Sequence, residues 1–112
     1  MTLLSSQQCI VCKKDSTPIK DTLISKYLLD IPQWQLHHED DIQFLQRVYK
    51  VSNFASAILL TNQIAELAEE QGHHPAILTE WGKVTVRWWT HTIGGLHLND
   101  FILAAKTEQL CT

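Results

Sequence analysis

Two adjacent histidines and a third further along the chain are the residues best suited to proton transfer. His73 and His74 stand directly before Pro75, which restrains the backbone, and His91 follows later. The pKa of an unperturbed imidazole is about 6.5, so histidine donates or accepts a proton near neutral pH with little adjustment. Taken singly, each is more typical of a hydrogen-bonded or exposed loop residue. Taken together, they indicate general acid–base catalysis if the fold brings them to one place.

Two carboxylates accompany these histidines in the sequence. Glu69 precedes His73 by one helical turn, and Asp100 follows His91. Either carboxylate could orient an imidazole or contact a ligand. The alternative for Glu69 is a solvated helix carboxylate, and the alternative for Asp100 is a helix cap that complements the helix dipole. Spacing alone leaves both pairs of roles open.

A metal site would use the same side chains, since imidazoles and carboxylates are the donors of zinc and iron centres. Adjacent histidines in a loop tend to diverge, however, whereas paired ligands on a helix lie one turn apart. Cys9 and Cys12 form a C-x-x-C pair, but no second pair completes a zinc site and no predicted strand precedes it. We therefore expect no metal at the histidines or at the C-x-x-C pair.

Helix signals define the elements that must position these residues. Asp21 is a suitable N-cap for a short helix that Pro32 ends. Asn53 caps a longer helix, which ends at Gly72, the residue type favoured just past a last turn, and before Pro75. The apolar stripe expected on this longer helix is Phe54, Ile58, Thr61, Ala65 and Ala68, flanked by Ala57, Leu60, Ile64 and Leu67.

Alternating apolar residues indicate four strands in two hairpins. The first hairpin covers residues 34–38 and 42–51, and its apolar residues recur at Trp34, Leu36, Ile42, Phe44 and Val48. The second covers residues 77–80 and 83–91 and turns at Trp81-Gly82. Within its second strand, Val84, Val86, Trp88 and Thr90 share one face, and Thr85, Arg87, Trp89 and His91 share the other.

A final helix opens at Asn99 or Asp100, with apolar residues at Phe101, Ile102, Ala105 and Leu110. The order is thus helix, strand, strand, helix, strand, strand, helix. It predicts an α+β fold of two layers, in which three helices pack on one face of a four-stranded antiparallel sheet. Residues 1–20 are predicted to form an N-terminal arm, and residues 21–112 a single domain.

The full set of candidate residues resembles the signature of the pterin-4a-carbinolamine dehydratase family. This set comprises Glu69, His73-His74-Pro75, Trp81, His91 and Asp100, at the spacing found in the family. The segments GHHPAILTEWGKVTVRWWTH, GGLHLNDFILAAK, IPQWQL and FLQRVYKVSNFASAILLTNQIAELAEE resemble it as well. The resemblance covers roughly residues 20–110, and the C-x-x-C arm is similar to that of bacterial members.

Membership of that family implies an enzyme that dehydrates a 4a-hydroxytetrahydropterin, with the pterin as substrate and with neither metal nor bound cofactor. The resemblance implies that His73, His74 and His91 line the pterin pocket and are catalytic. Our hypothesis within this set is that His73 and His91 are the proton-transfer pair and that His74 chiefly orients the pterin. It also implies further residues around the pterin, with core packing as the alternative for the tryptophans: Glu69, Gly72, Trp34, Trp81, Trp89, Thr90, Thr92 and Asp100.

The composition argues against several classes of partner. The net charge of -3, the pI near 6.0 and the lack of Lys or Arg runs argue against nucleic acid binding. No apolar stretch approaches the ~20 residues that span a bilayer, and no signal-peptide pattern is present. We expect a cytoplasmic protein.

Self-association is expected at the sheet face away from the helices. The chain has 4 tryptophans, more than one helix layer is expected to bury, so a homodimer is predicted, with a tetramer as the next choice. The resemblance adds an aromatic amino acid hydroxylase as a partner whose pterin is recycled. It also offers two alternatives to catalysis, namely a dimerisation cofactor for a transcription factor and a chaperone-like support of a hydroxylase.

Overall fold

The computed structural model describes residues 4–7, 9 and 19–111. The predicted order of helices and strands is confirmed, and two short 3₁₀ helices are added to it. The elements are η1 (Leu4–Ser6), α1 (Asp21–Leu28), β1 (Gln35–Glu39), β2 (Ile42–Lys50), α2 (Phe54–Gln71), β3 (Ala76–Glu80), β4 (Lys83–Trp88), η2 (His91–Ile93) and α3 (Leu98–Leu110).

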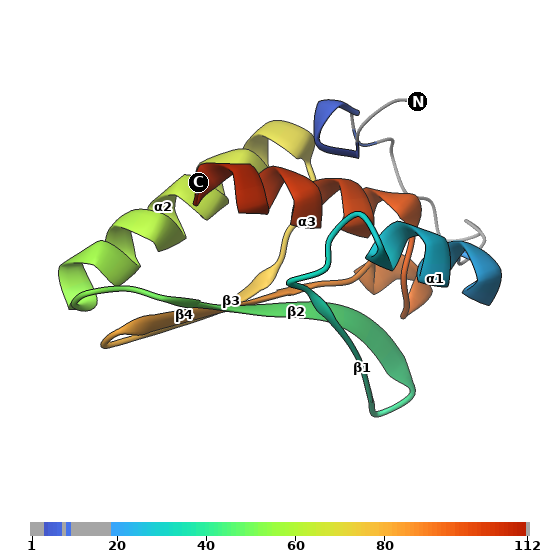
Figure 1. Cartoon of the computed structure of the whole chain (residues 1–112), viewed down its shortest axis with the longest axis horizontal. Helices are drawn as coiled ribbons and strands as arrows, with labels where there is room; N and C mark the ends of the chain where they lie inside the picture. Colours follow the sequence, from blue (N-terminus) through green and yellow to red (C-terminus); the bar gives the residue numbers. More distant parts are fainter. Residues whose placement is uncertain (1–3, 8, 10–18, 112) are drawn as a thin grey trace.

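The sheet is antiparallel, with the strand order β1-β2-β4-β3. Figure 1 shows α2 and α3 side by side over one face of it, while the β1–β2 hairpin bends away from the rest of the sheet toward its turn. Each hairpin turns through a left-handed backbone, at Asp40 and Asp41 (φ 50° and 63°) and at Gly82 (φ 81°). The predicted α+β architecture is therefore confirmed.

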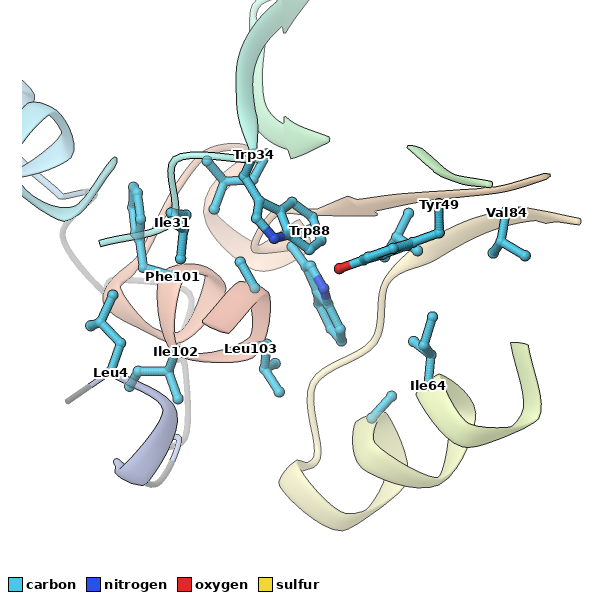
Figure 2. Close-up of a cluster of buried hydrophobic side chains, with 14 of the residues drawn as sticks. Leu4, Ile31, Trp34, Tyr49, Ile64, Val84, Trp88, Phe101, Ile102 and Leu103 are labelled. Atoms are coloured by element: carbon cyan, nitrogen blue, oxygen red, sulfur yellow. The ribbon is translucent and has the colours of Figure 1, made fainter. Parts of the chain in front are cut away.

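The core fills the space between the sheet and the helices. Figure 2 shows Trp34, Tyr49 and Trp88 converging there, close to the side chains of α3. The indole of Trp88 is fully buried, and its Nε1 donates to Thr107 Oγ1 at 3.2 Å. Tyr27 of α1 packs its ring on Phe101 of α3 (5.5 Å between centroids), which attaches the first helix to this layer.

The buried face of α2 differs from the predicted stripe. The Asn53 cap is confirmed, since its Oδ1 accepts from the Ser56 amide at 2.8 Å. Phe54 and Ile58, however, are 48% and 39% exposed. The residues that reach the core are the predicted flank and one stripe member: Ala57, Leu60, Ile64 and Ala68. The apolar stripe of α2 is wider than the arc of a helix that can contact a sheet. Tertiary packing therefore determines which edge of the stripe is buried.

The apolar residues that alternate in β2 do not face the helices. Leu45 and Tyr49 point into the core, and Phe44 lies on the opposite face of the sheet. Phe44 is nevertheless only 4% exposed. His37 stacks on its ring (5.4 Å), Trp89 tilts against it (6.2 Å) and the Arg87 guanidinium lies over it (4.7 Å). Part of the outer face is thus covered by its own side chains.

The helix caps also differ from two predictions. Lys20, rather than Asp21, is the N-cap residue of α1, and Asp21 lies in its first turn. The N-cap of α3 is His97, so Asn99 and Asp100 lie inside the helix, both buried. Leu110 is 39% exposed rather than packed. The observed N-cap of α3 precedes the predicted one because the Asp100 carboxylate belongs to a buried hydrogen-bond network, described below.

The described residues of the predicted arm pack against the domain. Leu4 is buried in the core, and Ser5 accepts hydrogen bonds from Lys106 and Gln109 of α3. The Cys9 amide donates to Gln71 Oε1 at 3.1 Å. Cys12, the other half of the C-x-x-C pair, lies outside the described residues.

Candidate active site

The end of α2 fixes His73. Gly72 has φ 65°, as predicted for a left-handed residue after the last turn, and the His73 amide then bonds Ala68 O at 3.2 Å. The His73 side chain is 10% exposed, and its ring stacks on Trp88 (5.9 Å, 10° between planes). Its Nε2 lies 2.7 Å from Asp100 Oδ1. Stacking and hydrogen bonding together leave this imidazole one orientation.

Asp100 joins three segments of the chain. Its carboxylate is fully buried, and Oδ1 contacts His73. Its Oδ2 accepts from Thr90 Oγ1 at 2.8 Å and from the His97 amide at 2.9 Å. The loop after α2, the segment after β4 and the start of α3 therefore meet at one carboxyl group. Of the alternatives for Asp100, the structure shows both: it caps a helix and it binds an imidazole.

His97 is a site residue that the sequence analysis missed. Its Nδ1 accepts a hydrogen bond from the Asn99 amide at 3.1 Å, so the side chain caps α3. Burial lowers the pKa of His97, the Asp100 carboxylate opposes this, and a proton on nearby His73 would add to the lowering. The spacing His97-x-x-Asp100 matches a capping box, but histidine is not among the preferred first residues, so the pattern was not recognised.

His91 lies in a different setting from that predicted. We expected β4 to run through His91, but the strand ends at Trp88 and His91 begins η2. The chain turns here because Thr90 and Gly95 pair with each other, with Thr90 N bonding Gly95 O at 2.8 Å. His91 is exposed, and its ring stacks on Trp89 (4.4 Å between centroids). The alternation of faces up to Trp89 is as predicted.

His74 points to solvent, unlike its neighbour His73. Its side chain is 60% exposed, and Nε2 lies 3.3 Å from Glu69 Oε2, whose own side chain is 79% exposed. Glu69 thus lies within reach of an imidazole and is also a solvated helix carboxylate, so both roles left open for it fit this geometry. The contact is long and solvated, so it restrains His74 weakly.

The remaining candidates divide into those near this network and those away from it. Thr90 is buried and bound to Asp100, Trp89 is half-buried, and Thr92 is exposed in η2. Trp34 lies in the core, 4% exposed and edge-on to Tyr49, which agrees with the core-packing alternative. Trp81 is 74% exposed on the β3–β4 turn. The structure thus brings together His73, Thr90, Asp100 and His97, with Trp34 and Trp81 elsewhere.

A cavity of about 530 Å³ lies apart from this network and contains none of the predicted site residues. Its lining comprises Gln33, Arg47, Tyr49, Lys50, Val51, Leu60, Glu108 and Cys111. Within it Glu108 Oε1 accepts from Arg47 Nε (2.8 Å) and from the Tyr49 hydroxyl (2.7 Å). This network links β2 to α3.

Comparison with known proteins places the chain in a family. A family model described as pterin 4 alpha carbinolamine dehydratase matches residues 17–110. The chain belongs to the pterin-4a-carbinolamine dehydratase family. A protein of Marinobacter nauticus that carries the name of a pterin-4-alpha-carbinolamine dehydratase is 54% identical over 110 residues, which cover 98% of this chain and 99% of that protein. The dehydratase family is one of hydro-lyases, so the chain is an enzyme of this class.

A solved structure shares the fold of this dehydratase-family chain. It is a transcriptional coactivator/pterin dehydratase from Brucella melitensis, with a TM-score of 0.76 and 24% sequence identity. The match covers 86% of this chain and 100% of that one. Among the described residues, no helix is long and apolar enough to cross a membrane. Within residues 4–7, 9 and 19–111, no three His, Cys, Asp or Glu side chains are grouped to hold a metal ion.

Proposed function

We propose that this enzyme removes the 4a-hydroxyl group of a carbinolamine pterin together with the N5 proton, giving a quinonoid dihydropterin. The C4a–O bond breaks, water leaves, and a C4a–N5 double bond forms. The reaction needs a general acid for the hydroxyl and a general base for the N5 proton. The observation that carries the proposal is the buried Asp100 carboxylate, which holds His73 and also binds Thr90, the residue before His91.

His73 is suited to the role of base. An ionised carboxylate only accepts hydrogen bonds, so Asp100 selects the tautomer of His73 that carries its proton on Nε2. Nδ1 then has the lone pair that accepts the N5 proton. Asp100 also stabilises the imidazolium that forms, as a buried carboxylate does for the histidine of a hydrolase triad.

His91 is suited to the role of acid. Its ring is exposed and is therefore able to exchange protons with water between turnovers. The ring of Trp89 stacks on it, 4.4 Å away, and restrains it while it donates to the leaving hydroxyl. We assign His74 and Glu69 to orienting the pterin, with Gly72, Trp89 and Thr92 beside it. The reaction is proposed to use no metal, so a chelator should leave turnover unchanged.

Alanine replacement of each histidine tests the assignment. General acid–base assistance is worth about 10²–10⁴-fold, so His73→Ala and His91→Ala should each lose about this much turnover on freshly generated carbinolamine. His38→Ala, which removes an exposed histidine on β1, is the matched control. Wild-type turnover in both site variants would exclude His73 and His91 as the proton-transfer pair.

Self-association is proposed from the apolar side chains left exposed. On α2 these are Phe54, Ile58 and Leu59 (48%, 39% and 62% exposed), and on β3 Leu78 is 58% exposed. A dimer, or a tetramer in which both surfaces are covered, would bury them. Light scattering should give at least twice the mass of one chain, and Leu59→Lys with Leu78→Lys should lower it.

The same exposed side chains support the alternative function, as a dimerisation cofactor for a transcription regulator. An aromatic amino acid hydroxylase is the proposed metabolic partner, in the cytoplasm, and a chaperone-like support of it is a third role. The double variant His73→Ala/His91→Ala separates these functions. Regulator binding or hydroxylase levels that persist without turnover would indicate a role beyond catalysis.

A further inference from the structure

The N-cap of α3 is chemically unusual. Serine, threonine, aspartate and asparagine favour this position, because their oxygens accept from an amide at any pH near neutrality. Here His97 Nδ1 accepts from the Asn99 amide at 3.1 Å. An imidazole nitrogen accepts only when it carries no proton, so this cap requires neutral His97 with its proton on Nε2.

We infer that His97 is a positioning residue for the His73–Asp100 pair and that it holds this pair only as the neutral imidazole. The inference rests on the proposed function. The cap fixes the first turn of α3, and the His97 amide donates to Asp100 Oδ2 at 2.9 Å. The other oxygen of that carboxylate holds His73 at 2.7 Å. A loosened cap would withdraw the His97 amide from Asp100 Oδ2, which would then keep only the Thr90 hydroxyl of its two donors. The carboxylate, and with it His73, would be free to shift.

Charge makes the cap sensitive to pH. Protonated His97 would place a positive ring against the Asn99 amide, at the positive end of the α3 dipole. Two titratable groups act on the ring, Asp100 from its own helix and His73 from the loop after α2. Burial and His73 outweigh Asp100, so the pKa of His97 lies below the ordinary value of about 6.5.

The sign of the effect follows from that direction. A histidine with a depressed pKa in the folded state binds fewer protons than it does in the unfolded chain at the same pH. Its contribution to stability is therefore complete above about pH 6.5 and is lost as the pH falls through the folded pKa. Acid should weaken the cap and, with it, the orientation of His73.

The test separates a cap from a catalytic group. His97→Asn keeps an acceptor that does not titrate, His97→Ala removes the acceptor, and His38→Ala on β1 is the control. The measurements, from about pH 5 to pH 8, are the midpoint of thermal unfolding, the ring resonances of His73 by NMR, and kcat and KM on the carbinolamine.

We expect His97→Ala at pH 8 to lower the midpoint by about 4–8 °C, from the usual loss on removing a cap. It should shift the His73 resonances and lower kcat about tenfold, with KM nearly unchanged, since a displaced group slows the chemical step. His97→Asn should restore the unfolding midpoint, the His73 resonances and kcat at pH 8. Below about pH 6.5 its unfolding midpoint should fall less steeply with pH than that of the wild type.

Two results would overturn the inference. One is a His97→Ala variant that matches His38→Ala in kcat and in its His73 resonances. The other is a His97→Asn variant whose unfolding midpoint falls in acid as steeply as that of the wild type. If wild-type protein fails to dehydrate the carbinolamine, the proposed function is wrong, and the unfolding and NMR measurements still decide whether His97 is a neutral cap.

Discussion

The surroundings of His73 and His91 differ in almost every respect. His73 is 10% exposed, stacked on the buried Trp88 and bonded to a buried carboxylate. His91 is exposed at the start of η2 and stacks on Trp89, whose ring in turn packs against Phe44. A hydrogen-bonded network holds the first imidazole, and a row of aromatic rings supports the second.

In the proposed mechanism, this difference gives a fixed imidazole as base and an adaptable one as acid. A base must meet its proton at one angle, which the Asp100 carboxylate and the Trp88 ring impose on His73. An acid that recharges from water has to stay accessible, and stacking restrains a ring without occupying its nitrogens. The variants below remove one kind of support at a time.

Asp100→Asn should have the largest effect. An asparagine amide turned toward His73 would donate instead of accept, which reverses the His73 tautomer and removes the lone pair at Nδ1. We expect turnover to fall about 10²–10⁴-fold and the free energy of unfolding to fall by about 1–3 kcal/mol. Enzyme kinetics and urea unfolding check these values.

Asp30→Asn, an exposed aspartate after α1, controls for the loss of one negative charge. Nitrogen NMR of His73 in Asp100→Asn adds a direct reading of the tautomer. A variant that kept both full turnover and the proton on Nε2 would show that Asp100 does not act through His73.

Trp89→Ala should have an intermediate effect. The ring lies between Phe44 and His91, and an aromatic contact of this kind is worth about 0.5–1.5 kcal/mol. Loss of that support corresponds to about 2–10-fold in kcat. Trp81→Ala is the matched control, since that tryptophan is 74% exposed on the turn. Equal kcat losses in the two variants would mean that stacking on His91 does not matter.

Glu69→Gln should have the smallest effect. Its contact with His74 is 3.3 Å long and both side chains are mostly exposed, and exposed pairs contribute at most about 1 kcal/mol. We expect KM for the carbinolamine to rise at most about fivefold, with kcat preserved. Glu70→Gln, an exposed neighbour, is the control. A large fall in kcat would move Glu69 from orienting the pterin to the chemical step.

Local signals predicted most of the architecture correctly. The Asn53 cap, the left-handed Gly72 and the Trp81-Gly82 turn each lie where expected, because each depends on a few neighbouring residues. The buried edge of α2 and the outward direction of Phe44 were not predictable in the same way. They depend on which surfaces meet after the sheet has twisted, and both Phe44 and Leu45 are apolar enough to be buried.

The candidate site divides along the same line. The residue types and their order along the chain indicated histidine chemistry on His73, His74 and His91, and the comparisons confirm the family. Nothing in the order of residues distinguishes His73 from His74, although one is held by a buried carboxylate and the other is in solvent. His97 was missed because histidine is not a preferred N-cap residue, and its contacts form only at the start of the folded α3.

The sequence itself, through residue type and spacing, therefore determined the set of candidate histidines, the alternation of hairpins and helices, and the ends of α2. Only the tertiary structure decided which imidazole is fixed, because Asp100 and His73 lie 27 positions apart and meet only when α2 and α3 pack on the same face of the sheet. Burial then determines how strongly each contact acts, and burial is a property of the folded chain as a whole.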